Sequence, residues 1–96
     1  MSKIPKIKDI IRVVAIYDFE LPDKTITLPE KIYSECIDTE KIIVVKYPFL
    51  LTDNIVKLSD LKVLSTPNMH CCLSLDLCKT MGLNFDADII TILKQK

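Results

Sequence analysis

The segment that decides the fold lies toward the C-terminal end, where residues 76–94 read DLCKTMGLNFDADIITILK. Asp76 suits the N-cap of a helix and Gly82 suits the residue that follows its C-terminus, so the two bracket a helix of about two turns. A helix this short is not stable alone in water and must lie against a sheet. The β-branched residues after the turn predict a buried strand over residues 88–94.

The first half of the chain repeats this order of signals. Pro29 and Glu30 suit the first turn of a helix that extends to Ile37, and the IIVV run within residues 41–47 predicts a second buried strand. A longer apolar run and a short strand precede each helix, at residues 10–19 and 25–28 in the first half and at residues 58–65 and 70–75 in the second.

The two halves also align with each other. Sliding the chain by 47 residues places apolar residues on apolar residues at Ile11/Leu58, Val14/Leu61, Ile16/Val63, Tyr17/Leu64, Ile26/Leu73, Leu28/Leu75, Ile42/Ile89, Ile43/Ile90 and Val45/Ile92. A strand, strand, short helix, strand unit used twice fits a double-psi β-barrel, whereas a ferredoxin-like sandwich needs longer helices. We therefore predict a mainly β fold, a closed six-stranded barrel with two short helices and an internal pseudo-twofold repeat, in which residues 1–48 and 49–96 form the halves of one domain.

Composition limits the protein class. The chain has 96 residues, 49% of them hydrophobic, which is enough for one domain with a single core. Its 13 basic and 13 acidic residues cancel, so no overall positive field attracts nucleic acid or a membrane. The longest uncharged stretch, residues 63–75, contains a proline and is shorter than the 18 or so residues of a membrane span. Because the N-terminal residues MSKIPKIKDI lack a signal-peptide pattern, we expect a soluble protein of the cytoplasm, or of the host cytoplasm if it is viral.

Four cysteines, Cys36, Cys71, Cys72 and Cys78, raise the question of zinc or disulfides. Adjacent residues of a strand point to opposite faces, so Cys71 and Cys72 are poorly placed to ligate one ion together. His70 is next to them, but the chain has no C-x-x-C pair. We expect buried reduced thiols and no zinc.

The turn before the last strand carries the candidate chemistry. Asp86 and Asp88 are two residues apart, and such a pair can share a hard divalent cation. The other interpretation is a polar turn whose carboxylates accept hydrogen bonds from otherwise unpaired backbone amides. Spacing alone leaves both open.

Residues 43–92 resemble the double-psi β-barrel of the largest, β′-like subunit of multisubunit DNA-directed RNA polymerases. Residues 82–88, GLNFDAD, fall on the hallmark N-A-D-F-D-G-D, and residues 73–79 resemble the strand and short helix before it. Upstream, Lys46 to Leu50 fall on the R-x-P-x-L segment of that family, and Leu61 to Leu64 fall on the strand after it.

The resemblance implies a Mg²⁺ site for nucleotidyl transfer, because three aspartates hold the ion in that family. It assigns two metal ligands to Asp86 and Asp88, a third position to the neutral Asn84, and a buried anchor to Phe85. Lys46 stands where an arginine contacts substrate or nucleic acid. With Asn84 in place of an aspartate we expect weak Mg²⁺ binding, and with alanine at position 87 the loop changes its path if that position requires a positive φ.

Two functions follow as expectations. The first is an RNA polymerase-like catalytic barrel, viral or plasmid-borne, that is inactive alone and completed by other polymerase subunits or a second barrel domain. The second is a non-catalytic double-psi barrel that serves as a binding or assembly module. Nucleic acid is then reached through partners, a homodimer is compatible with the pseudo-twofold, and no membrane partner is expected. A decarboxylase-type barrel needs a self-cleaving Gly-Ser, but Gly82 is followed by Leu83.

A basic N-terminal arm is the last candidate feature. Lys3, Lys6, Lys8 and Arg12 outnumber Asp9 and could follow a phosphate backbone. No aromatic residue is interleaved with these charges, which favours a solvated tail instead.

Overall fold

A computed structural model describes residues 7–47 and 55–95 of the chain. The basic arm before residue 7 and residues 48–50 of the polymerase-like segment lie outside the described residues. The strands are β1 (Ile7–Tyr17), β2 (Thr25–Pro29), β3 (Ile42–Lys46), β4 (Val56–Lys57), β5 (Lys62–Thr66), β6 (Cys71–Leu73) and β7 (Asp88–Gln95). The α-helices are α1 (Glu30–Glu35) and α2 (Leu75–Met81), and two 3₁₀ turns are η1 (Thr39–Lys41) and η2 (Leu58–Asp60).

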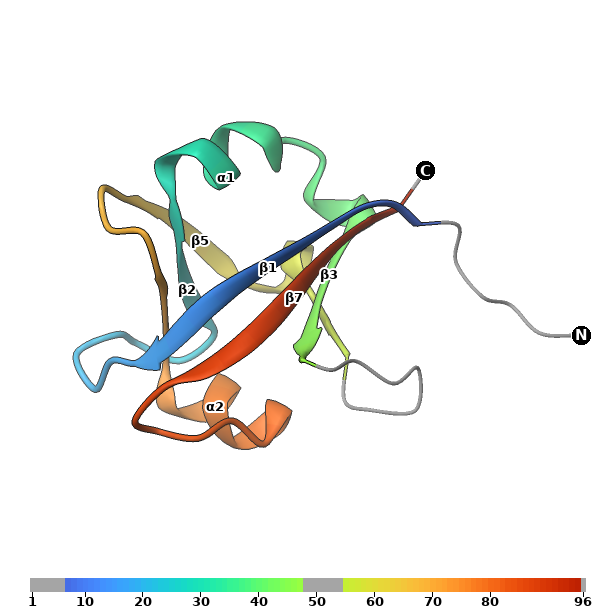
Figure 1. The fold of residues 1–96 in the computed structure, drawn as a ribbon. Helices are drawn as coiled ribbons and strands as arrows, with labels where there is room; N and C mark the ends of the chain where they lie inside the picture. The colour runs from blue at the N-terminus through green and yellow to red at the C-terminus, as the bar shows by residue number, and fades with distance from the viewer. Residues whose placement is uncertain (1–6, 48–54, 96) are drawn as a thin grey trace, which may run out of the picture.

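The strands form one curled, mixed sheet in the order β4-β3-β7-β1-β6-β2-β5. The long strands β1 and β7 run antiparallel across the front of Figure 1, with α1 at one end of the molecule and α2 at the opposite end. The pairs β1·β6 and β2·β5 are parallel, whereas β2·β6 and β3·β7 are antiparallel. The fold is therefore mainly β with two short helices, as the sequence predicts.

The closed six-stranded barrel is not confirmed. The sheet has seven strands, and within residues 7–47 and 55–95 no ladder joins the end strands β4 and β5. The predicted strand at residues 58–65 is interrupted by η2, which the amide of Leu61 closes by donating to the carbonyl of Leu58 at 3.1 Å. η2 occupies the first three residues of the predicted strand and separates β4 from β5, which gives the sheet a seventh strand, and the sheet is a curled half-barrel.

The second helix agrees closely with its prediction. Gly82 ends α2 in the left-handed conformation, with φ at 69°, where a side chain would be strained. The prediction of Asp76 as the N-cap is wrong, because Ser74 occupies that position and Asp76 lies in the first turn. Pro29 ends β2 and precedes α1 directly, so its fixed φ serves the strand-to-helix junction.

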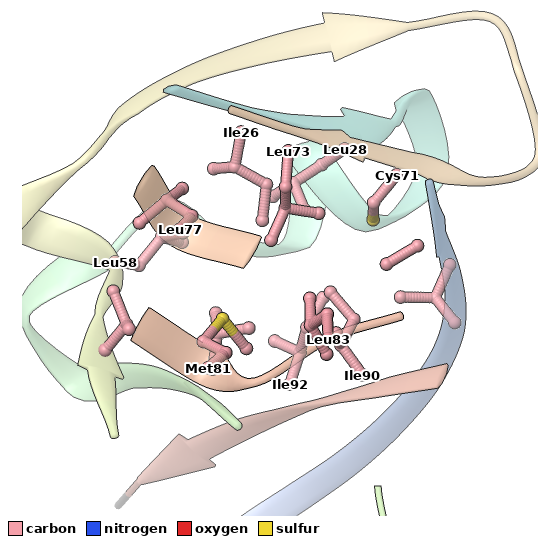
Figure 2. Packing of buried hydrophobic residues seen from close by; sticks show 14 of the residues in the cluster. Ile26, Leu28, Leu58, Cys71, Leu73, Leu77, Met81, Leu83, Ile90 and Ile92 are labelled. Atoms are coloured by element: carbon pink, nitrogen blue, oxygen red, sulfur yellow. The ribbon is translucent and has the colours of Figure 1, made fainter. Parts of the chain in front are cut away.

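The main core lies inside the curl of the sheet, where aliphatic side chains from both ends of the chain converge (Figure 2). Its labelled members are Ile26, Leu28, Leu58, Cys71, Leu73, Leu77, Met81, Leu83, Ile90 and Ile92. A smaller cluster of Ile43, Val45 and Leu93 lies on the other face, since these residues alternate with core residues along β3 and β7. The alignment of Val45 with Ile92 as core equivalents is therefore wrong in face, although both are buried.

The 47-residue offset holds in the β2·β6 ladder. In the β2·β6 ladder, Ile26 pairs with Leu73, which is 47 positions later. Two cross-strand hydrogen bonds flank this pair, from the amide of Cys72 to Oγ1 of Thr27 at 2.8 Å and from the amide of Thr25 to Oγ of Ser74 at 3.3 Å. The same offset relates the two donors, and it also relates the two acceptors.

β1 and the segment that leads into β5, on the two sides of this ladder, deviate from that offset. Val14 is 45% exposed, whereas Leu61, at the aligned position, packs against the main core. A shift of register by one residue reverses the faces of a strand. The 3₁₀ turn η2 lies where the aligned part of the first half is the extended strand β1, so the two halves have different register there. A single offset therefore relates β2 to β6 but does not relate β1 to β5.

The four cysteines are free thiols. Cys71 is fully buried and Cys72 is partly exposed, as predicted for neighbours on one strand. Burial, together with the neighbouring thiols of Cys72 and Cys36, raises the pKa of Cys71 to about 12, so this thiol stays protonated at neutral pH. In the described part of the chain, no helix is long and apolar enough to cross a membrane.

Candidate functional site

The candidate loop, residues 83–87, connects α2 to β7 beside the end of β3. The left-handed Gly82 turns the chain out of α2, and the amide of Leu83 donates to the carbonyl of Cys78 at 2.8 Å. The side chain of Leu83 is buried in the main core. The loop is thus fixed at its first residue, and its polar residues follow.

Asp88 is the centre of the polar contacts in this loop. Its Oδ1 accepts from the amide of Ile89 at 2.8 Å, and its Oδ2 accepts from the amide of Asn84 at 3.1 Å. The ammonium of Lys46 lies 3.8 Å from Oδ2. Both carboxylate oxygens of Asp88 therefore have hydrogen-bond donors, and its charge has a counterion.

Lys46 reaches this position from the end of β3. Its Nζ also donates to the carbonyl of Gly82 at 3.2 Å, so it contacts both the start and the end of the loop. The side chain of Asp88 is only 20% exposed and that of Lys46 is 44% exposed, so water screens this pair less than a fully exposed one. The expected substrate-contacting lysine is here an intramolecular partner of the expected metal ligand.

Asn84 and Asp86 form a local turn. The side-chain oxygen of Asn84 accepts from the amide of Asp86 at 3.3 Å, an arrangement typical of polar turns. Among the described residues, no hydrogen bond or ion pair involves the carboxylate of Asp86, which is exposed. The structure thus brings Asn84, Asp88 and Lys46 together and leaves the Asp86 carboxylate outside that group.

The remaining motif positions differ from expectation. Phe85 is 49% exposed and packs its ring on Tyr17, with centroids 5.2 Å apart, so the prediction of a buried anchor is wrong. Lys24 is the one non-glycine residue of the described chain with positive φ, so Ala87 adopts an ordinary backbone conformation. The loop therefore follows a path that does not require glycine at position 87.

The donor set, as arranged, does not fit a catalytic Mg²⁺ ion. Such an ion is held by one or two unpaired carboxylates together with substrate oxygens and water, but Lys46 already compensates Asp88, which leaves the carboxylate of Asp86 alone. The neutral oxygen of Asn84 is used within the turn. Across residues 7–47 and 55–95, no group of three or more His, Cys, Asp or Glu side chains could hold a metal ion together.

Sequence reasoning missed a second polar cluster, which surrounds Asp76. Both carboxylate oxygens accept from the amide of Lys24 at 3.0 Å, and Oδ1 also accepts from the hydroxyl of Ser74. Partial burial opposes ionisation, but these hydrogen bonds outweigh it and hold the pKa of Asp76 below its ordinary value. Lys24 has the left-handed φ of 59°, a conformation that sequence does not reveal at a lysine.

Two surface grooves also emerge only in three dimensions. The apolar groove, about 480 Å³, lies between β1, the start of α1 and the turn after β5, and its lining includes Val13, Val14, Pro29, Ile32 and Met69. The charged groove, about 750 Å³, lies between η2 and α2, and its lining includes Lys24, Lys57, Asp60, Asp76 and Leu77. Five pairs of lining residues are 47 positions apart, one in each groove: Arg12/Ser59, Val13/Asp60, Val14/Leu61, Pro29/Asp76 and Glu30/Leu77.

Comparison of the chain with models of known protein families found no match, and comparison with curated proteins found none either.

Proposed function

We propose that this chain is a double-psi barrel domain of the RNA polymerase largest-subunit type that works as a non-catalytic binding or assembly module. In this proposal the Lys46–Asp88 pair takes the place of the catalytic metal ion. The observation that carries it is the 3.8 Å contact between the two side chains, together with the two backbone amides that complete the hydrogen bonding of Asp88.

Three features of the sheet support the barrel part of the proposal. The β2·β6 ladder and its two flanking side-chain hydrogen bonds obey the 47-residue offset. The parallel pairs β1·β6 and β2·β5 exchange roles between the halves, as a pseudo-twofold requires. The two grooves also have lining positions related by the same offset.

The module reading is favoured by charge. A divalent ion at Asp88 would have to displace the ammonium of Lys46 and also compete with two backbone donors. Any Mg²⁺ bound by Asp86 and Asp88 is therefore weakly held, and the isolated chain does not polymerise nucleotides. Partners of such a module are other polymerase subunits, a second barrel domain or a second copy, with nucleic acid reached through them. Free, largely buried thiols suit the reducing cytoplasm.

The second candidate is a catalytic barrel completed by a partner. The exposed carboxylate of Asp86 favours it, because this group has no contact in the described chain and is free to bind an ion. A partner that supplies further ligands and draws Lys46 away would then assemble the site.

Calorimetric titration with Mn²⁺ tests whether Lys46 takes the place of a metal ion beside Asp88. We expect weak binding to the wild-type chain, a modest gain in Asn84→Asp, and a further gain on the order of tenfold when Lys46→Met is added, because the competing cation is gone. Lys41→Met is the matched control, since Lys41 is paired with Asp38 on an exposed surface away from the loop. Tight binding to the wild-type chain would contradict the module proposal, as would no effect of Lys46→Met in the Asn84→Asp background.

A further inference from the structure

We infer that the apolar groove binds an extended segment of a partner protein, which adds a strand to the open edge of β1 in line with β6. This inference specifies a partner for the proposed module, and it uses none of the residues of the 83–87 loop. It rests on the geometry of one strand edge and on the side chains that surround it.

Within residues 7–47 and 55–95, the edge of β1 opposite β7 is unpaired over more than half the length of the strand. β6 pairs with β1 over Ala15 to Tyr17, whereas β7 pairs with β1 along nearly the whole strand. Among the described residues, no backbone hydrogen bond joins the turn at residues 67–70 to β1. β1 and the turn at residues 67–70 therefore lie apart, and the apolar groove lies between them.

In the part of β1 before Ala15, alternate backbone groups face the apolar groove. The amide of Asp18 donates to the carbonyl of Leu73 on β6 at 3.0 Å, and alternate residues of a strand direct their backbone groups to the same edge. Arg12 and Val14 therefore direct their amides toward the β6 side, beyond the point where β6 pairs with β1. The guanidinium of Arg12 lies 4.9 Å from the ring of Tyr47, which directly follows β3. The side chain of Arg12 therefore extends toward β3 and away from the unpaired edge of β1.

An unpaired strand edge beside a cavity determines the chemistry of its ligand. Amides and carbonyls spaced along an extended strand are matched by another extended polypeptide backbone. The groove walls add a requirement for apolar side chains, because Val13 and Ile32 line it from the inner side and Met69, 84% exposed, lines it from the turn. The occupant is thus an extended segment with apolar residues at alternate positions.

The charged groove at the aligned position cannot bind in this way. There the chain forms the 3₁₀ turn η2 instead of an extended edge, and Asp60 and Asp76 replace the apolar wall. An extended apolar segment therefore has one compatible groove of the two. This selectivity within one molecule provides an internal comparison for the test.

The test uses a phage-displayed library of random dodecapeptides selected on the full chain without metal. Selected peptides are synthesised with a fluorescent label and titrated by anisotropy. Met69→Asp places a charge on the apolar wall, and Val14→Pro removes an amide that makes no backbone hydrogen bond to the turn at residues 67–70. Each should weaken binding on the order of tenfold or more. Ile37→Asp is the matched control, because Ile37 is 86% exposed and lies outside the groove.

Backbone pairing has its own signature. N-methylation of alternate amides in a selected peptide should abolish binding for one alternating set and spare the other, since one edge of the added strand faces β1. The inference is overturned if no peptide is enriched, if Met69→Asp binds as well as the wild-type chain, or if both methylated sets bind equally. A dimer in sedimentation equilibrium that Met69→Asp dissociates would instead assign the groove to a second copy. None of these readouts depends on the Mn²⁺ titration, so the groove and the loop fail or succeed separately.

Discussion

The two grooves occupy aligned positions but differ in backbone and in chemistry. The apolar groove has an extended strand along one wall and mostly apolar lining, whereas the charged groove has a 3₁₀ turn and more acidic and basic side chains. The substitution of Asp60 for Val13 and of Asp76 for Pro29 accounts for much of that contrast. The carboxylate of Asp76 accepts hydrogen bonds from the amide of Lys24, so this amide is not available to a ligand in the charged groove.

The comparison teaches that the two halves match in the β2·β6 ladder and differ in the segments beside it. The β2·β6 ladder is symmetric in register and in its side-chain hydrogen bonds. Outward from it, η2 interrupts one half while β1 continues for 11 residues in the other. The free energy of unfolding should therefore depend similarly on matched positions of the β2·β6 ladder, and binding of an extended segment should depend on the first-half side of the molecule, where the apolar groove has β1 along one wall.

The largest expected effect concerns the β2·β6 ladder, where the two halves match. Ile26 and Leu73 are paired and fully buried, so replacement of either by alanine should cost about 2–5 kcal/mol through lost burial and an unfilled cavity. Urea denaturation measures both. Costs that differ by more than about 2 kcal/mol would show that β2 and β6 are not equivalent.

A smaller loss is expected in the outer cluster. Val45→Ala should cost about 1–3 kcal/mol, because Val45 belongs to a cluster of three residues apart from the main core. Ile92→Ala, in the main core, should cost about 2–5 kcal/mol. The same unfolding assay compares them, and an equal or larger loss at Val45 would mean that the outer cluster is a second core of comparable weight.

The flanking hydrogen bonds should contribute less again. Ser74→Ala and Thr27→Ala each leave a cross-strand amide without its side-chain acceptor, so each should cost about 1–2 kcal/mol. Ser74→Ala should cost more than Thr27→Ala, because Ser74 also donates to Asp76. Thermal unfolding gives the ranking, and the reverse order would show that the Asp76 cluster adds no stability beyond the shared pattern.

The smallest effect is a pH dependence confined to the charged groove. The folded-state pKa of Asp76 is lowered from 3.8, so its ionised form stabilises the fold above that value, and this contribution is lost as the pH falls through the folded pKa. Asp76→Asn should therefore lower stability at pH 7 and have less effect at pH 3. Urea denaturation at both pH values checks this, and an equal deficit at the two would mean that shape, not charge, matters at this position.

The sequence predicted the elements well where a local signal was strong. Gly82 ends its helix in the conformation expected of glycine, and the β-branched runs form β3 and β7. The interruption at η2 and the faces of Val45 and Val14 could not be predicted, because one residue of register reverses a strand and local sequence does not determine register.

The candidate site was predicted as a set of residues but not as an arrangement. Lys46, Asn84 and Asp88 do come together, 36 or more positions apart in the case of Lys46. That the lysine would neutralise Asp88, and that Phe85 would lie half-exposed on Tyr17, depends on side-chain packing between distant strands. The grooves left no trace in the sequence, because each is assembled from segments that lie far apart in the chain.

The position of β7 has a consequence for how the protein forms. This strand, residues 88–95, lies between β1 and β3 in the sheet, so strands made early during synthesis meet only through one that is made late. During translation the early strands expose unpaired edges until β7 leaves the ribosome, and such edges promote aggregation. Folding must also close a loop of most of the chain before the β1·β7 ladder forms, which makes a slow folding step the expected behaviour of this topology.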